Sequence, residues 1–389
     1  MDNPAQHPLA DLVYRTYRQH YPGTPLLACS PGRINLIGEH TDYNQGLVLP
    51  AAIDNYIIAA IGKRDDSTIQ LHALDQHQTY RTTLSRLERS GHLWPDYILG
   101  VVQQLQMAGY PISGFNLVFA GNIPQGAGLS SSAALECAAV AALNALFSLG
   151  MAPLDMALTG QAAENKFVGV NCGLMDQFAS VFGRKQQLIK LDCADFSYQY
   201  IPFDHTDIRL VLLDTRVKHS LAASAYNERR AQCERGVALI GQHHPGVTSL
   251  RRATFSQLEQ YILPVDKTTY LRCRYVVAEI QRVADGCADL LQGNLAAFGQ
   301  RMFETHHGLR HEYDVSCAEL DLLVDFMQGH DAVLGARMMG GGFGGCTINL
   351  VKSHSVQDVV YAAAHAYRKK TGKDLQVYLA NISDGTRLL

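Results

Sequence analysis

The sequence predicts an α+β fold in two domains, and three observations support this prediction. The chain has 389 residues, which is long for a single hydrophobic core. In its first half, short segments rich in β-branched residues alternate with helical segments and are bounded by turn residues. Beyond about residue 205 the pattern becomes mainly helical, with a small sheet of its own, so we expect domains over 1–205 and 206–389.

Helical spacing and turn residues predict the individual elements in chain order. Helices are expected over 9–20, 131–147 and 153–168, and then through most of 221–330. Strands are expected over 47–62, 67–73, 114–121, 187–193, 208–214 and 346–351. A glycine-rich loop at 122–132 joins the third of these strands to the longest apolar helix.

Composition and charge exclude several classes of protein. The net charge of −3 comes from 33 basic and 36 acidic residues spread along the chain, so we expect no nucleic-acid or membrane partner. Residues 1–17 lack the pattern of a secretory signal, and Glu136 and Asn144 interrupt the longest apolar stretch. Nine cysteines without a CxxC spacing fit reduced thiols. We therefore expect a soluble cytoplasmic protein.

A dense polar cluster ends the stretch SPGRINLIGEHTDYNQG, residues 30–46. A turn is expected at Pro31-Gly32, and the apolar residues that follow predict a buried segment. The segment ends in the consecutive residues Glu39, His40, Thr41, Asp42 and Tyr43. A structural turn needs only one or two hydrogen-bonding side chains, so the purpose of this cluster must come from the rest of the sequence.

A glycine-rich loop precedes the long helix in PQGAGLSSSAALE, residues 124–136. Gly126 and Gly128 allow a ligand to approach the main chain closely, and three serines lie where the helix begins. The unpaired N–H groups at a helix start favour phosphate oxygens, and serine hydroxyls add donors or a ligand for Mg²⁺. A serine-capped helix is the structural alternative. The chain has no GxxxxGK[ST] sequence, so if a nucleotide binds, a P-loop does not hold it.

A second glycine-rich segment lies in GARMMGGGFGGCTINLV, residues 335–351. Gly340, Gly342 and Gly345 match the GxGxxG spacing of dinucleotide-binding proteins, in which the glycines follow a strand and open a helix. Here they lead into a strand, which rejects the hypothesis of a dinucleotide oxidoreductase. Five glycines in six residues still predict a backbone pressed against a neighbour, with a tight turn as the alternative.

Two carboxylates attract attention in QAAENKFVGVNCGLMDQFAS, residues 161–180. Glu164 lies in a helical segment, where a carboxylate is usually solvated. Asp176 lies among apolar residues, where a carboxylate needs a partner, as in structural ion pairs and in catalytic sites alike. His307 and His311 have the spacing of a metal pair, but the glutamate of zinc-protease signatures is missing, so we expect surface histidines.

Taken together, these stretches resemble the galactokinase family, within the superfamily of galactose, homoserine, mevalonate and phosphomevalonate kinases. GRINLIGEHTDYNQG is similar to the family's galactose-binding signature, IPQGAGLSSSAALE to its ATP-binding motif, and GGGFGGC to its C-terminal glycine motif. CGLMDQF and YNERRAQCE also have the family's form. The resemblance therefore covers nearly the whole chain.

The resemblance implies a fold, a reaction and partners. The N-terminal domain would be like the second domain of ribosomal protein S5 and the C-terminal domain ferredoxin-like, with the active site in the cleft between them. The reaction would transfer the γ-phosphoryl group of ATP to the anomeric hydroxyl of α-D-galactose, giving galactose 1-phosphate and ADP in galactose catabolism. The implied cofactor is Mg²⁺, the implied partners are galactose and ATP, and the implied oligomeric state is a monomer.

The resemblance also assigns roles to residues of this chain by matching motif positions. The sugar-binding positions match Glu39, His40, Thr41, Asp42 and Tyr226. The ATP-binding loop matches Gly126, Ala127, Gly128, Leu129, Ser130, Ser131 and Ser132. The Mg²⁺ positions match Ser132 and Glu164, and the catalytic pair matches Asp176 and Arg33. His311 stands where the family usually has an acidic residue, and we expect an adjusted contact between the domains there.

Physical chemistry explains why such residue types suit this reaction. A sugar presents hydroxyl groups that both donate and accept, so a site that pairs each hydroxyl rejects an epimer lacking it. Arg33 beside Asp176 would favour the charged carboxylate, which makes it a weaker base. Two mechanisms therefore stay open. Asp176 accepts the proton late, or it orients the hydroxyl while Arg33 stabilises the developing charge.

Two other functions stay open on the sequence alone. A non-catalytic relative that binds galactose and ATP as a regulatory sensor would keep the fold. An N-acetylgalactosamine 1-kinase would differ in the pocket around C2 of the sugar. The intact serine loop and the presence of Arg33, Glu164 and Asp176 favour a kinase over a sensor.

Overall fold

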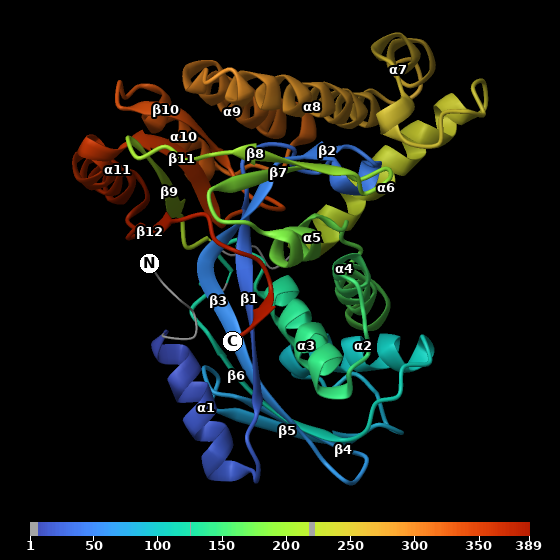
Figure 1. The fold of residues 1–389 in the computed structure, drawn as a ribbon. Coiled ribbons are helices and arrows are strands. Elements are labelled where there is room, and N and C mark those ends of the chain that lie inside the picture. The colour runs from blue at the N-terminus through green and yellow to red at the C-terminus, as the bar shows by residue number, and fades with distance from the viewer. Residues whose placement is uncertain (1–6, 125, 218–221) are drawn as a thin grey trace.

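The computed structural model describes residues 7–124, 126–217 and 222–389, and the strands in these ranges form three sheets (Figure 1). The largest is six-stranded, in the order β13-β1-β3-β6-β4-β5. Its strands are β1 (Leu26–Asn35), β3 (Pro50–Lys63), β4 (Thr68–Ala73), β5 (Gln78–Thr83), β6 (Phe115–Gly121) and β13 (Arg387–Leu388). The β4–β6 pair is parallel and the other pairs are antiparallel.

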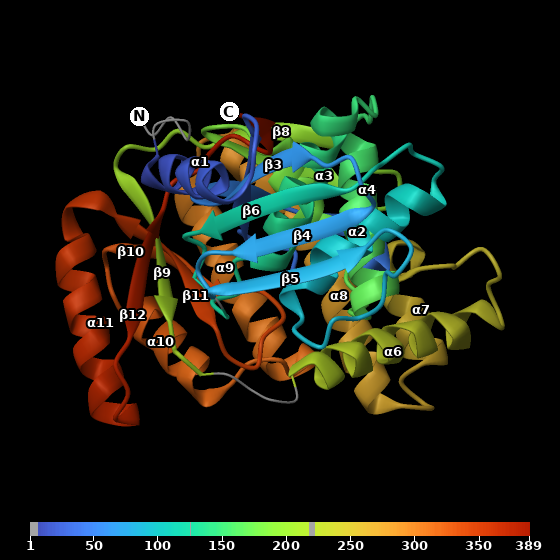
Figure 2. The same cartoon turned by 90° about the horizontal axis from the view of Figure 1, so that it is seen from below.

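Helices cover both faces of this sheet (Figures 1 and 2). On one face α1 (Pro8–His20) packs Val13 and Tyr17 against Ala60 and Val118. The other face carries α2 (Trp94–Met107), α3 (Ser131–Phe147) and α4 (Pro153–Ala162). Successive strand residues therefore enter two different cores, as the alternation of side chains along a strand requires.

A second, three-stranded sheet lies beside the first. It has the order β2-β7-β8, with β2 (Leu47–Val48), β7 (Gln187–Asp192) and β8 (Tyr198–Pro202). The short helix α5 (Met175–Phe182) packs against β7 through Phe178. The predicted sugar-binding turn leads into this sheet through β2, and α5, which carries Asp176, packs on the same sheet.

The third sheet is four-stranded and antiparallel, in the order β10-β11-β9-β12. Its strands are β9 (Ile208–Asp214), β10 (Val333–Met338), β11 (Cys346–Lys352) and β12 (Gln376–Ala380). The helices of this part are α6 (Ala222–Gly241), α7 (Phe255–Tyr261), α8 (Lys267–Leu291), α9 (Leu295–Gly308), α10 (Ala318–Gln328) and α11 (Val356–Thr371). Helices α10 and α11 share an apolar core with β9, and α9 packs on β10.

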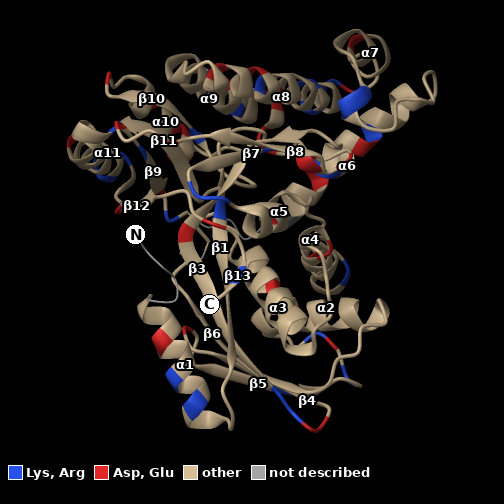
Figure 3. Cartoon of the chain, viewed as in Figure 1, with Lys and Arg blue, Asp and Glu red and all other residues tan. Residues whose placement is uncertain are grey.

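The boundary expected between 205 and 206 falls between β8 and β9. The chain end then crosses back, because β13 pairs with β1 in the first sheet. Figure 3 shows Lys and Arg interspersed with Asp and Glu along the outer helices, among them α1, α6 and α8. Within the described ranges, no helix has both the length and the apolar character needed to cross a membrane.

Several predicted elements agree with the structure and several were missed. The helix predicted over 131–147 is α3 with the same bounds, and the strand at 346–351 is β11. The predicted helix over 153–168 is α4 followed by one π-helical turn, Ala163–Val168. The helical region expected from 221 begins at Ala222 in the described residues, since residue 221 lies outside them. The sequence prediction omitted β5, α2, β8, β10, α11 and β12.

The turn predicted at Pro31-Gly32 is wrong, because both residues lie inside β1. The register of β1 against β3 shifts between Pro31 and Arg33, which marks a bulge rather than a chain reversal. A Cβ on Gly32 would stand 2.8 Å from the carbonyl oxygen of Leu129. Glycine is needed here because the strand passes directly against the serine loop.

Candidate active site

Arg33 and Asp176 form a two-pronged ion pair. Arg33 lies in β1 just after the bulge, and its backbone N–H donates to Leu129 O at 3.1 Å. Its Nε donates to Asp176 Oδ1 at 2.7 Å and its Nη2 to Oδ2 at 2.9 Å. The Arg33 side chain is 6% exposed and that of Asp176 24%, so the pair is largely desolvated but open on the Asp176 side. The partner that the sequence demanded for Asp176 is therefore Arg33.

The same pair holds the serine loop in place. Arg33 Nη1 donates to Gly128 O at 2.5 Å, and Ser130 Oγ donates to Asp176 Oδ2 at 2.5 Å. Asp176 also lies in the first turn of α5, where the helix dipole favours a negative charge. The carboxylate thus receives three hydrogen bonds, two on Oδ2 and one on Oδ1. A further hydroxyl can still approach Oδ1.

The serine loop and the second glycine segment face each other. Gly126 and Gly128 have φ of 77° and Ser130 has φ of 55°, so three residues of this loop are left-handed. A Cβ on Gly340 would stand 3.6 Å from the Cα of Gly128. The glycines after β10 therefore lie against the loop, and the interpretation of a backbone pressed against a neighbour is confirmed.

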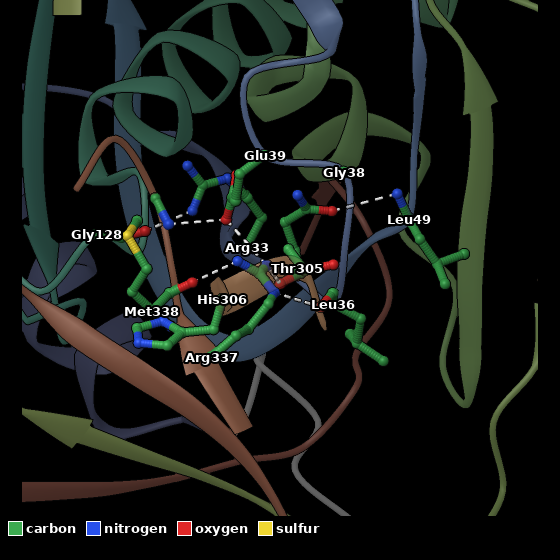
Figure 4. A network of polar contacts seen from close by, with 12 residues as sticks. Arg33, Leu36, Gly38, Glu39, Leu49, Gly128, Thr305, His306, Arg337 and Met338 are labelled. Atoms are coloured by element: carbon green, nitrogen blue, oxygen red, sulfur yellow. Dashed lines mark hydrogen bonds and ion pairs between the residues drawn. The ribbon is translucent and has the colours of Figure 1, made fainter. Parts of the chain in front are cut away.

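The polar cluster after β1 forms a tight turn that faces a cavity. Gly38 has φ of 100° and His40 has φ of 63°, which direct consecutive side chains to different sides. Glu39 accepts from Arg337 Nη2 at 3.0 Å and from Gly340 N–H at 2.8 Å (Figure 4). His40 Nδ1 lies 2.7 Å from the Tyr43 hydroxyl, and burial lowers the pKa of His40 to about 4. His40 is therefore neutral at physiological pH.

Thr41 differs from its neighbours in the turn. It is fully buried, and its hydroxyl donates to Gly38 O and Leu47 O at 2.9 and 2.6 Å. It does not line the cavity. The structure therefore gives Thr41 the role of closing the turn, whereas the sequence motif suggested contact with the ligand.

The cavity has a volume of about 170 Å³ and is lined from both parts of the chain. Its lining residues include Arg33, Glu39, His40, Asp42, Glu164, Asp176, Tyr226 and Gly341. Tyr226 comes from α6, and its ring centroid lies 5.4 Å from that of His40. The predicted site residues of the turn, α5 and α6 are thus brought together, Thr41 excepted.

Asp42 is held close to the chain before α5. A Cβ on Gly173 would stand 2.0 Å from Asp42 Oδ2, so only glycine fits at that position. Burial, assisted by the negative charge of Asp176, raises the pKa of Asp42 to about 7. Asp42 thus differs from Asp176 and Glu39, which line the same cavity but are paired with Arg33 and Arg337.

A second, larger cavity of about 630 Å³ opens at the start of α3. Ser131 and Ser132 line it, together with residues from β3, β6 and α2. Among these, Trp94 is 6% exposed and donates from its indole nitrogen to Gln78 Oε1 at 2.8 Å. Trp94 and Tyr97 were not predicted from the sequence, although Trp94 is the only tryptophan of the chain and therefore marks this segment.

Glu164 and Ser132 lie together near the serine loop. A hydrogen bond from Ser132 reaches Glu164, but burial and the charge of Asp176 outweigh it and raise the pKa of Glu164 to about 7. Gln177 Nε2 donates to Glu164 Oε2 at 2.8 Å and to Glu136 Oε2 at 2.9 Å. Burial, with the charge of Glu164, also raises the pKa of Glu136 well above its usual value.

These residues fit an Mg²⁺ ion that is carried mainly by nucleotide phosphates. Within the described ranges, no group of three or more His, Cys, Asp or Glu side chains could hold a metal alone. Mg²⁺ in kinases is commonly bound by one or two protein ligands and by substrate phosphates. Glu164 and the hydroxyl of Ser132 are oxygen donors of this kind, and the hydrogen bond between them brings them side by side.

The two histidines with metal spacing lie on the surface. His307 and His311 are exposed, and their ring centroids are 4.5 Å apart. The expectation of surface histidines is therefore confirmed. The contact between domains expected at His311 is not seen among the described residues, where its ring contact is with His307 on the same helical segment. Exposure on the outer side of this segment directs the ring toward solvent.

Comparison with known families and proteins places each motif in a family. The GHMP kinases N terminal domain matches residues 96–184, the galactokinase galactose-binding signature residues 15–63, and the GHMP kinases C terminal family residues 288–370. The chain is 40% identical over 370 residues to a galactokinase of Roseiflexus sp. (strain RS-1), covering 95% of this chain and 94% of the relative. It is 38% identical to a galactokinase of Thermotoga petrophila, with 92% and 98% covered.

Solved structures extend the comparison to the fold. The crystal structure of Lactococcus lactis galactokinase complexed with galactose superposes with a TM-score of 0.94 at 34% identity, covering 98% of this chain and 100% of the other. Methanococcus jannaschii mevalonate kinase matches with a TM-score of 0.65 at 16% identity over 94% and 100% of the two chains, which shows a common fold alone. The expected two-domain α+β kinase fold is confirmed.

Proposed function

The chain belongs to the galactokinase family, and from this premise we propose that it transfers the γ-phosphoryl group of ATP to the anomeric hydroxyl of α-D-galactose. One observation carries the proposal. The carboxylate of Asp176 accepts hydrogen bonds from Arg33 and from Ser130 of the serine loop, and it also lines the small cavity. The cavity and the loop therefore meet at this carboxylate. A phosphoryl acceptor bound in that cavity would then meet the phosphates of a nucleotide bound at the loop.

The sugar would occupy the cavity of about 170 Å³. Glu39, Asp42 and neutral His40 offer acceptors, while Tyr226 closes the side formed by α6. Thr41 would act indirectly, by closing the turn that carries these side chains. The anomeric hydroxyl would lie at Asp176, where the open position on Oδ1 can accept its hydrogen.

ATP would place its phosphates on the loop from Gly126 to Ser132 and its base in the cavity of about 630 Å³. The N-terminal N–H groups of α3 and the serine hydroxyls supply the donors for phosphate oxygens. Ser132 and Glu164 would hold the Mg²⁺ that accompanies the nucleotide. When bound, this ion supplies neutralisation of the phosphate charge that develops during transfer.

Arg33 and Asp176 then divide the remaining work. Arg33 fixes the carboxylate by two parallel hydrogen bonds, and Asp176 orients the attacking hydroxyl and takes up its proton as transfer proceeds. Arg33 already compensates much of the negative charge of Asp176, which makes this carboxylate a weak base. We therefore infer that Asp176 first orients the sugar hydroxyl and accepts its proton only late in the transfer. The loose transition state of phosphoryl transfer is compatible with late deprotonation.

The finer properties of the protein follow the same proposal. We propose domains over 1–205 and 206–389, with β13 returning to the first. All nine cysteines are described and none forms a disulfide, which supports a reducing, cytoplasmic location. Residues of one chain line both cavities, which supports activity as a monomer.

ADP release by the purified protein tests the proposed function. With ATP and Mg²⁺ present, we expect strong turnover with galactose and weak or no turnover with glucose, N-acetylgalactosamine or mevalonate. Equal or better turnover with N-acetylgalactosamine would contradict the proposed substrate. Binding of galactose and ATP without ADP release would contradict the proposed reaction and favour a regulatory sensor.

The requirement for Mg²⁺ is expected to depend on pH. Burial raises the pKa of Glu164 to about 7, and a metal ligand must be deprotonated, so protons compete with Mg²⁺ below that pH. The half-saturating Mg²⁺ concentration should rise as the pH falls from about 8 to 6, by up to about tenfold per pH unit. Glu164→Gln is the control, since it removes this titration but not that of ATP. Equal pH dependence in the two proteins would contradict the role of Glu164.

A further inference from the structure

Arg337 is a fully buried arginine that donates to Glu39 of the proposed sugar site and to main-chain carbonyls beside it (Figure 4). It lies on β10, in the third sheet, just before the glycines of the segment 335–351, and it does not line the cavity. Its Nε donates to Leu36 O at 2.5 Å, its Nη1 to Met338 O at 2.5 Å, and its Nη2 to Asn35 O. A guanidinium buried this deeply is stable only when such acceptors satisfy it.

The fourth partner of Arg337 is the carboxylate of Glu39. Nη2 donates to Glu39 Oε1 at 3.0 Å, and the N–H of Gly340 donates to the same oxygen at 2.8 Å. Two donors on Oε1 fix the rotation of the carboxylate. No described residue donates to Oε2, while Glu39 lines the cavity, so Oε2 is the oxygen left for a ligand hydroxyl.

Arg337 also ties two separate parts of the fold together at this point. Asn35 is the last residue of β1 in the first sheet and Leu36 follows it, whereas Arg337 and Met338 end β10 in the third. Gly340 and Gly341, which line the cavity, follow Met338 after one further residue, Met339. One side chain therefore sets where the turn with Glu39 stands relative to the glycine segment.

We propose that Arg337 is a positioning residue for sugar recognition, which orients Glu39 so that Oε2 alone accepts one hydroxyl of the sugar. The inference rests on the proposed function, and it explains how a single acceptor atom is presented rather than a freely rotating carboxylate. A lysine at this position offers a single ammonium centre and cannot reproduce the planar fork to Leu36, Asn35 and Glu39. Orientation of Glu39 would then be lost although the positive charge remains.

Arg337→Lys is the variant that tests this proposal. We expect KM for galactose to rise at least about tenfold, with KM for ATP unchanged and kcat reduced less, since a ground-state contact with the sugar is weakened. We also expect the preference for galactose over glucose to narrow, because a loosely held carboxylate discriminates hydroxyl positions less well. Arg301→Lys is the matched control. It removes a partly buried arginine that pairs with Asp285 and Asp289, away from both cavities, and should leave all these constants unchanged.

A double-mutant cycle separates positioning from a general effect on packing. Because Arg337 acts through Glu39, Arg337→Lys should not raise KM for galactose further once Glu39→Ala is present. Additive effects on KM, or failure of Arg337→Lys to fold by circular dichroism, would overturn the proposal and assign Arg337 to the fold alone. A wild-type protein that does not turn over galactose would instead contradict the proposed function.

Discussion

Asp176→Asn is expected to lower kcat with galactose by about 10³-fold while the protein remains folded. The amide cannot accept the proton of the anomeric hydroxyl, and it cannot accept hydrogen bonds on both of its terminal atoms from Arg33. Arg33 Nη2 and Ser130 Oγ now meet on Oδ2, so an NH₂ group there would face two donors. The measurement is ADP release at saturating ATP and galactose, together with galactose affinity from thermal-shift titration.

The effect on kcat should exceed the effect on binding. Glu39, His40, Asp42 and Tyr226 keep the sugar in the cavity, so galactose should still stabilise Asp176→Asn against heat. Arg33→Ala should also lose activity, because it frees the carboxylate and removes the hydrogen bond to Gly128 O in the serine loop. Near-normal turnover in either variant would contradict the assignment of this pair.

A comparison of Asp176→Asn with a further variant, Asp176→Ser, distinguishes the two mechanisms that the sequence left open. If Asp176 only orients the hydroxyl, Asp176→Ser, whose side chain can also hold a hydroxyl, should recover part of the activity lost in Asp176→Asn. If proton uptake matters, both variants should be equally inactive, and activity should not return as the pH is raised. The fork from Arg33 to both oxygens of Asp176 makes orientation a necessary part of either mechanism.

The residues that the sequence predicted well are those whose chemistry conflicts with their surroundings. Asp176 among apolar residues required a partner, and the partner is Arg33. Left-handed Gly126 and Gly128, with the serines after them, could be placed at a helix start because glycine and serine have strong local preferences. Such local conflicts and preferences can be recognised from the sequence without a structure.

Tertiary contacts decided the features that were missed. Pro31 and Gly32 have the composition of a turn, yet the pairing of β1 with β3 keeps them in a strand, and the closeness of Leu129 explains the glycine. The functional meaning of Arg337 depends on Leu36 and Glu39, about 300 residues earlier in the chain. No local pattern reports a contact over that distance, although an arginine between apolar residues of LGARMM was a visible anomaly.

Thr41 illustrates the limit of reasoning by motif position. It stands between two cavity-lining side chains, so the motif alone suggested that it also meets the ligand. The left-handed backbone of His40 rotates the chain at this point and turns the Thr41 hydroxyl toward Gly38 O and Leu47 O. Proximity in sequence within a tight turn therefore does not imply a common direction of the side chains.

Asp42→Asn is expected to weaken galactose binding and, at the same time, to stabilise the protein without ligand. The loss of a charged acceptor should raise KM for galactose about 10- to 100-fold. Burial, with the charge of Asp176, raises the pKa of Asp42 to about 7, above the value of roughly 3.9 in an unfolded chain. Between these two values the native state binds more protons than the unfolded state, so the stability of the native state falls as the pH rises through this window.

Asparagine removes that penalty, because it carries no charge at any pH. The free energy of unfolding of Asp42→Asn should therefore exceed that of the wild type by roughly 1–3 kcal/mol at pH 8, and the gain should vanish near pH 4. Urea denaturation of both proteins without ligand at the two pH values measures this difference. Asp66→Asn is the control, because the pKa of Asp66 is shifted in the opposite direction: the hydrogen bond from Arg64 lowers it. Removing the charge of Asp66 should therefore not increase the free energy of unfolding.

The combination of the two effects is what distinguishes a binding residue from a structural one. A structural aspartate, paired with its own cation, would destabilise the protein when replaced and would do so most at high pH. For Asp42, burial and the negative charges of Asp176 and Glu39 outweigh the backbone hydrogen bond from Tyr43 and the charge of Arg33, so hydrogen bonds donated by a ligand in the cavity would compensate its unfavourable ionisation. Loss of stability at pH 8 together with unchanged KM would show that Asp42 serves the fold and that the sugar lies elsewhere.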